Sequence, residues 1–223
     1  MINTTSVYRP DQVLIQQFRE VAKCYSASCV FADAQGRRNV MHSTIKPIFP
    51  GKLVGPAFTV KLSTGDLQDG LAALDMAKAG DVIVVDAGGD TETSVWGGLM
   101  TQLCQQNGVE GAIIDGAGRD VDEMRDLKFM FFSRAITPRG THTMFSKRQD
   151  EVRLQVPIQC GGVLVSPGDM IVADEIGVTV IVRPDQQEVL RLARDQAERE
   201  EKTRRAIAGG KTYAQLIEEF GRI

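Results

Sequence analysis

Residues 81–134 read DVIVVDAGGDTETSVWGGLMTQLCQQNGVEGAIIDGAGRDVDEMRDLKFMFFSR, and this stretch decides the fold. Three apolar runs in it predict buried strands, at 81–89, 111–116 and 129–134. Two amphipathic segments between them predict helices, at 94–108 and 119–127. Because alternating strands and helices favour parallel pairing, the stretch predicts an α/β core.

The flanking sequence extends this core on both sides. Before residue 81, the pattern predicts helices at 11–23 and 66–80. It also predicts strands at 28–34 and 54–62. After residue 150 the chain is rich in β-forming residues, which predicts a small antiparallel or mixed section packed on the core. Helices are expected at 184–208 and 213–220. We therefore expect one domain over residues 1–223 with a C-terminal helical extension from about residue 184.

Composition excludes several classes of function. The chain has 26 Lys and Arg against 29 Asp and Glu, a net charge of −3, so it lacks the basic field of a nucleic-acid-binding protein. No apolar run approaches the roughly 18 residues of a membrane span, and the N-terminus has no secretory pattern. The four cysteines follow no disulfide-like spacing, which predicts reduced, mostly buried thiols. Together these features predict a cytoplasmic protein.

Soft metal ligands are scarce. The chain has two histidines, His42 and His142, and four scattered cysteines, with no CxxC or HExxH motif. A zinc site built on Cys or His clusters is therefore disfavoured. Any metal would be held mainly by oxygen atoms.

Glycine is concentrated between Gly80 and Gly118, near the junctions of strands and helices. Ligands of open α/β sheets bind at the carboxyl ends of strands, where glycine lets the backbone approach them. The first amides of the helix in 94–108, those of Gly98, Leu99 and Met100, could hold a carboxylate. Alternatively, Gly97 and Gly98 only permit close helix packing. A nucleotide-binding loop is disfavoured because GxGxxG is absent.

A second loop, IIDGAGRDVDE, combines two acids with an arginine. Asp120 and Glu123 are three residues apart and share one helix face. Arg119 presents a planar fork that suits a carboxylate. Mg²⁺ and Mn²⁺ prefer a few carboxylates with several waters, which this pair could supply. The alternative is that acids in a first helical turn merely complement the helix dipole.

The two loops together resemble the RraA-like family and the related class II pyruvate aldolases, which act on 4-hydroxy-4-methyl-2-oxoglutarate or 4-carboxy-4-hydroxy-2-oxoadipate. Gly98, Arg119, Asp120 and Glu123 fill the pattern Gly-x20-Arg-Asp-x2-Glu/Asp of the RraA-like branch, whereas the aldolases proper have Asp at position 98. The resemblance extends from about Ser26 to Gly209. One departure is Ile176, in the turn that begins at Asp174, where a second acid is common.

The resemblance implies a single compact α/β/β domain of the phosphohistidine-swivelling type. It also implies homotrimers, sometimes stacked as hexamers, with active sites at the subunit interfaces. Asp120, with Glu123 directly or through water, would hold Mg²⁺ or Mn²⁺. Arg119 would bind the pyruvyl oxygens of a 2-oxo acid, and the amides of Gly98, Leu99 and Met100 would hold its carboxylate. Glu200 of a neighbouring subunit is expected to reach the site.

The implied chemistry is cleavage of a 4-hydroxy-2-oxo acid to pyruvate. Decarboxylation of oxaloacetate would pass through the same enolate, whose charge the metal and Arg119 would stabilise. The alternative is a non-catalytic regulator that binds and inhibits a ribonuclease, a role also found in this family. The intact motif argues against regulation alone, because a pure regulator has no need of Glu123.

Overall fold

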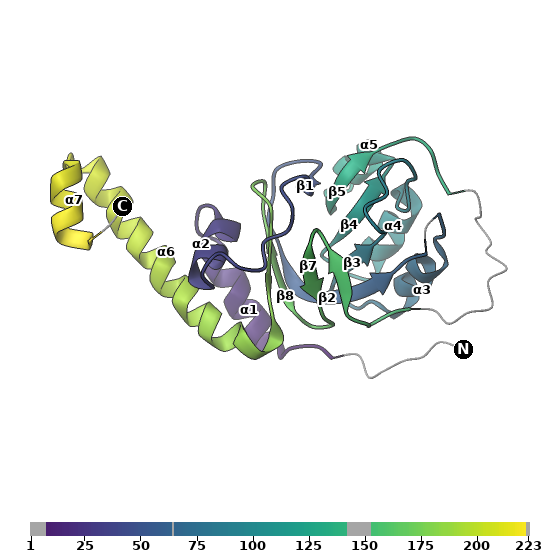
Figure 1. The fold of residues 1–223 in the computed structure, drawn as a ribbon, viewed down its shortest axis with the longest axis horizontal. Helices are drawn as coiled ribbons and strands as arrows, with labels where there is room; N and C mark the ends of the chain where they lie inside the picture. The colour runs from purple at the N-terminus through teal and green to yellow at the C-terminus, as the bar shows by residue number, and fades with distance from the viewer. Residues whose placement is uncertain (1–7, 64, 142–152, 222–223) are drawn as a thin grey trace.

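Four parallel strands form the core that the sequence predicts. In the computed structural model, which describes residues 8–63, 65–141 and 153–221, these strands are β2 (Leu53–Lys61), β3 (Val82–Asp86), β4 (Gly111–Gly118) and β5 (Met130–Ile136). The helices between them are α3 (Gln68–Met76), α4 (Gly98–Gln106) and α5 (Val121–Asp126). The α/β prediction is therefore confirmed (Figure 1).

Antiparallel strands complete this sheet at both edges. Strand β1 (Lys46–Pro47) pairs with β5, while β8 (Met170–Ala173) pairs with β2 and with β9 (Val178–Ile181). The seven strands lie in the order β1-β5-β4-β3-β2-β8-β9. Strands β6 (Ile158–Cys160) and β7 (Val163–Val165) form a separate hairpin. The expected antiparallel section thus divides between the main sheet and a hairpin on it.

The sheet is covered differently on its two faces. Alternate residues of β3 point to opposite sides, so Ile83 and Val85 pack with α3, α4 and α5, whereas Val82 and Val84 pack with the β6–β7 hairpin. A third apolar cluster joins β8 and β9 to helices α1 (Gln12–Val21), α2 (Ala27–Ala34) and α6 (Gln186–Ala208). Burial on both faces explains why the core strands read as unbroken apolar runs.

The strand predicted at 28–34 is wrong, because these residues form helix α2. A short apolar run does not distinguish a buried strand from a buried helix. The helix is capped by a residue distant in sequence: Asp174 accepts hydrogen bonds from the Ser28 amide at 2.9 Å and from the Ser28 hydroxyl at 2.7 Å. The turn that begins at Asp174 therefore has a structural role, which the sequence left unassigned.

Helix α6 extends away from the sheet as an arm, and helix α7 (Tyr213–Phe220) folds back at its tip (Figure 1). Helices α1 and α2 pack on the half of α6 nearest the sheet. The charged half carries i,i+4 ion pairs, such as Arg204–Glu200 at 2.6 Å, as expected of a solvated face. In the described part of the chain, no helix is both long and apolar enough to cross a membrane. Of the cysteines, all free, Cys104 and Cys160 are buried, but Cys24 is half-buried and Cys29 exposed.

Candidate active site

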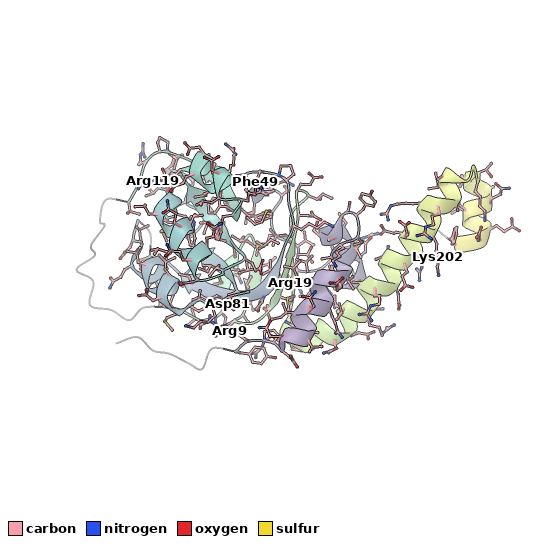
Figure 2. The ribbon with its side chains drawn as sticks, turned by 180° about the vertical axis from the view of Figure 1, so that it is seen from behind. Arg9, Arg19, Phe49, Asp81, Arg119 and Lys202 are labelled. Atoms are coloured by element: carbon pink, nitrogen blue, oxygen red, sulfur yellow. The ribbon has the colours of Figure 1, made fainter. Side chains whose placement is uncertain are left out.

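Backbone hydrogen bonds join the β3–α4 loop to the end of β4 and to Arg119, the residue that follows this strand. The Val95 amide donates to the Ala117 carbonyl, and the Arg119 amide donates to the Trp96 carbonyl, each at 3.0 Å. Because residues 94–96 are held in this way, α4 begins at Gly98 and not at residue 94 as predicted. The start of α4 is thereby fixed beside Arg119, which lies at the opposite end of the molecule from Lys202 on α6 (Figure 2).

Asp120 places its carboxylate against the start of α4. Its backbone is left-handed, with φ of 56° and ψ of 40°, a conformation that Asp tolerates better than most residues. Its Oδ2 atom accepts a hydrogen bond from the Gly98 amide at 3.1 Å and lies 3.6 Å from Arg119 Nε. One of the three amides predicted to bind a substrate carboxylate therefore bonds a carboxylate of the protein itself.

Glu123 approaches the same glycine from the next turn. A Cβ on Gly98 would lie 1.7 Å from Glu123 Oε2, so any other residue at this position would displace the carboxylate from where it lies. Gln102 Nε2 donates a hydrogen bond to Glu123 Oε1. Gln102 was not predicted from the sequence, although it lies four residues after Gly98 on the same helix face.

The first turn of α4 also presents the amides of Leu99 and Met100. Amides in a first helical turn have no helical carbonyl to bond, so they are available to a ligand. The Met100 side chain is buried in the core, whereas that of Leu99 is 76% exposed. The structure thus brings together Gly98, Leu99, Met100, Arg119, Asp120 and Glu123, as predicted from the sequence.

Trp96 supports the first turn of α4 from the core. Its indole Nε1 donates to Thr101 Oγ1 at 3.0 Å, and Thr101 Oγ1 donates to the Gly97 carbonyl at 3.2 Å. Trp96 is buried and packs against Phe131, with ring centroids 6.3 Å apart. These contacts fix the backbone that carries the Gly98, Leu99 and Met100 amides.

The carboxylates of Asp120 and Glu123 suit a hard cation. Both carboxylates flank Gly98, and they offer a cation only oxygen ligands. Among residues 8–63, 65–141 and 153–221, no group of three or more His, Cys, Asp or Glu side chains gathers as a complete ligand set. Mg²⁺ is commonly bound by one or two carboxylates and keeps several waters, so the pair fits it. His142 lies outside the described residues.

Glu200 lies far from this cluster in the same chain. It pairs with Arg204 and accepts a hydrogen bond from Gln196 on α6. Figure 2 shows Lys202, two residues further along this helix, at the opposite end of the molecule from Arg119. A chain therefore does not bring its own Glu200 to its own site, and a contribution from a neighbouring chain stays a prediction.

A second charged cluster lies at the carboxyl ends of the strands, on the face that the hairpin covers. Lys61 pairs with Asp86, and Arg134 pairs with Asp115, which lies next to Asp86 in the sheet. Both carboxylates also accept hairpin amides, from Gln159 to Asp86 at 3.3 Å and from Gly161 to Asp115 at 2.6 Å. The hydrogen bond to Asp115 raises the pKa of Arg134. This cluster was not predicted from the sequence, although Asp86 and Asp115 each follow an apolar run.

Comparison with known proteins agrees with this architecture. The family model RraA-like, described as Aldolase/RraA, matches residues 21–180. A protein of Halalkalibacterium halodurans named "Putative 4-hydroxy-4-methyl-2-oxoglutarate aldolase" is 37% identical over 195 residues, which cover 87% of this chain and 88% of the relative.

Two solved structures share the fold. An uncharacterized protein from Pseudomonas syringae pv. tomato superposes with a TM-score of 0.78 at 27% identity, covering 95% of this chain and 96% of its own. Streptomyces coelicolor RraAS2, described as an unusual member of the RNase ES inhibitor RraA protein family, superposes with a TM-score of 0.74 at 29% identity, covering 88% and 98%. The extent of the family match, together with the Gly98, Arg119, Asp120 and Glu123 cluster, shows that this chain belongs to the RraA-like family.

Proposed function

We propose that this protein is a divalent-metal-dependent carbon–carbon lyase that cleaves a 4-hydroxy-2-oxo acid to pyruvate and also decarboxylates oxaloacetate. The observation that carries the proposal is the convergence of Asp120, Glu123 and Arg119 on the first turn of α4. The aldolase name of the relative from Halalkalibacterium halodurans supports the same class of reaction.

Each residue of the cluster has a distinct role in this proposal. Asp120 and Glu123 would hold Mg²⁺ or Mn²⁺, which when bound supplies a Lewis acid for the 2-oxo group. The Leu99 and Met100 amides bind the carboxylate of the 2-oxo acid, joined by the Gly98 amide once Asp120 releases it. Arg119 donates to the pyruvyl oxygens.

Arg119 also stabilises the negative charge that develops as the C3–C4 bond of the substrate breaks. As the C3–C4 bond breaks, its electron pair forms the C2–C3 double bond and the carbonyl π pair moves to the 2-oxo oxygen, where the guanidinium offsets the developing charge. Retro-aldol cleavage requires a base for the C4 hydroxyl proton, and a water held by the Glu123 carboxylate is our candidate. Decarboxylation releases CO₂ and requires no such base. Protonation at C3 then yields pyruvate.

Pyruvate release tests the proposal directly. We expect oxaloacetate and 4-hydroxy-4-methyl-2-oxoglutarate to yield pyruvate in a lactate-dehydrogenase-coupled assay with Mg²⁺ or Mn²⁺. Oxalate, which mimics the enolate, should inhibit, and EDTA should stop turnover. Asp120→Ala should abolish activity, whereas Asp122→Ala, an exposed acid of the same turn, should retain it. Unchanged turnover in Asp120→Ala would rule out this assignment.

We also propose a homotrimer or stacked hexamer in which Glu200 of one chain completes the site of another. Glu200 lies on α6, whose Lys202 is at the opposite end of the molecule from Arg119 in Figure 2, so only another chain could bring Glu200 to this site. Light scattering gives the oligomeric state. Mixing inactive Asp120→Ala chains with inactive Glu200→Ala chains should restore part of the activity, since some interfaces would then combine two intact contributions.

The second candidate function is inhibition of a ribonuclease. The likeness to RraAS2, whose family is described as RNase ES inhibitors, favours it. A pull-down with the regulatory region of a ribonuclease tests this role. Absence of binding at micromolar concentrations would leave only the enzyme.

A further inference from the structure

We infer that Asp120 occupies the carboxylate-binding position of the site until a cation draws it away, so that the cation must bind before the 2-oxo acid. This inference rests on the proposed function and concerns the order in which the same site is filled. It assigns Asp120 a role in the empty protein in addition to its proposed role as a metal ligand.

The contacts of Asp120 are those expected of a substrate carboxylate. Its Oδ2 atom accepts the Gly98 amide at 3.1 Å and lies 3.6 Å from Arg119 Nε. These two donors are among those that the proposed function assigns to the 2-oxo acid. While Asp120 accepts the Gly98 amide, that amide is not available to an incoming anion, and the negative charge beside Arg119 Nε weakens the attraction of Arg119 for one.

The backbone keeps Asp120 in this position. Its backbone is left-handed, with φ of 56°, and its carboxylate reaches the Gly98 amide at the start of α4. Gly97 leaves room for the carboxylate, because a Cβ there would lie 2.6 Å from Asp120 Oδ2. A tethered carboxylate competes at an effective concentration on the order of millimolar or above. A free monocarboxylate at lower concentration therefore does not displace it.

Glu123 provides the reason for Asp120 to move when a cation arrives. Its carboxylate lies against the same glycine, and among the described residues no ion pair neutralises it. A cation would attract both carboxylates, and the turn of Asp120 toward it would release the Gly98 amide and Arg119. Cation binding is thereby coupled to the opening of the carboxylate position.

Anion binding to metal-free protein tests this inference without any measurement of turnover. We would titrate oxalate into EDTA-treated protein by calorimetry and follow Trp96, the one tryptophan of the chain, by fluorescence. Asp120→Ala should bind oxalate at least about tenfold more tightly than the wild type, the size of one charge-assisted hydrogen bond. With Mg²⁺ present, the wild type should instead bind oxalate more tightly than Asp120→Ala does.

Two further variants keep the test decisive. Asp120→Gly removes the carboxylate in a residue that adopts positive φ without strain, so it should reproduce the gain even where alanine disturbs folding. Glu123→Ala removes the same charge nearby but leaves the contact between Asp120 and Gly98 intact, so its gain should be much smaller.

Equal gains in Glu123→Ala and Asp120→Ala would overturn the inference in favour of simple charge repulsion. No gain in either Asp120 variant would overturn it as well. A wild type that releases no pyruvate with Mg²⁺ would instead reject the proposed function.

Discussion

The Oε2 atom of Glu123 lies where a side chain on Gly98 would begin, because a Cβ there would be only 1.7 Å away. The residue types at these two positions therefore depend on each other. A chain with Asp at position 98, as in the aldolases that this sequence resembles, must hold the carboxylate of residue 123 elsewhere. In this chain the acid comes from position 123, whereas in those aldolases position 98 carries one.

Gly98→Ala tests this dependence. The new methyl should displace the Glu123 carboxylate, which ends a flexible, half-buried side chain, so activity should fall while the free energy of unfolding falls by less than about 1 kcal/mol. In a Glu123→Ala background the same change should cost little, which a double-mutant cycle by denaturant unfolding would reveal. Gly70→Ala is the matched control, since its Cβ would meet Met100 and Leu62 at ordinary distances of 3.5 and 3.8 Å. Additive effects at Gly98 and Glu123 would contradict the close approach.

Arg119→Lys should lower kcat/KM for oxaloacetate by about 10- to 100-fold, because lysine keeps the charge but loses the planar fork. Steady-state kinetics measures this directly. Arg139→Lys is the control, since Arg139 is exposed and lies 4.0 Å from Glu92. Equal kinetic constants for both variants would show that the guanidinium of Arg119 is not used.

Thr101→Val should destabilise the start of α4, because the buried indole N–H of Trp96 loses its acceptor. An unpaired buried donor costs about 1–3 kcal/mol, measured here by denaturant unfolding followed through Trp96 fluorescence. Thr101→Ser keeps the hydroxyl and should lose much less. If Thr101→Val were no more destabilising than Thr101→Ser, the hydrogen bond from Trp96 would not be what stabilises the start of α4.

Asp115→Ala should cost about 3 kcal/mol, because it strands the Arg134 guanidinium and the Gly161 amide. The Arg134 side chain is 21% exposed, so water offsets part of the larger loss expected at full burial. Asp33→Ala removes the exposed partner of Arg37 and should change stability by less than about 0.5 kcal/mol. Thermal and denaturant unfolding of the two variants would separate these cases.

The sequence predicted the parts of the fold that depend on local pattern. The apolar runs that became β2 to β5 and the three helices between them follow from periodicity. It failed at 28–34, where the cap of α2 comes from Asp174, a partner 146 residues away. The start of α4 was misplaced for a similar reason, since hydrogen bonds with Ala117 and Arg119, which are distant in sequence, hold Val95 and Trp96 outside the helix.

The candidate site shows the same division. Spacing and resemblance predicted that Gly98, Arg119, Asp120 and Glu123 lie together, as they do in the structure, while their roles stay predictions. They did not reveal that Asp120 bonds the Gly98 amide, or that Asp86 and Asp115 anchor the hairpin. These contacts depend on tertiary distances, which a single sequence does not contain.

The hydrogen bond from the Arg119 amide to the Trp96 carbonyl closes a loop in the chain. From Gly98 the backbone leaves along α4, turns, and returns along β4 to Arg119. One residue added to α4 would rotate everything after it by about 100°, and one added to β4 would exchange the faces of the strand. The number of residues between Gly98 and Arg119 is therefore the number that the chain needs to leave along α4 and return along β4. A search for other chains with this site should let the intervening residues vary freely and keep their number constant.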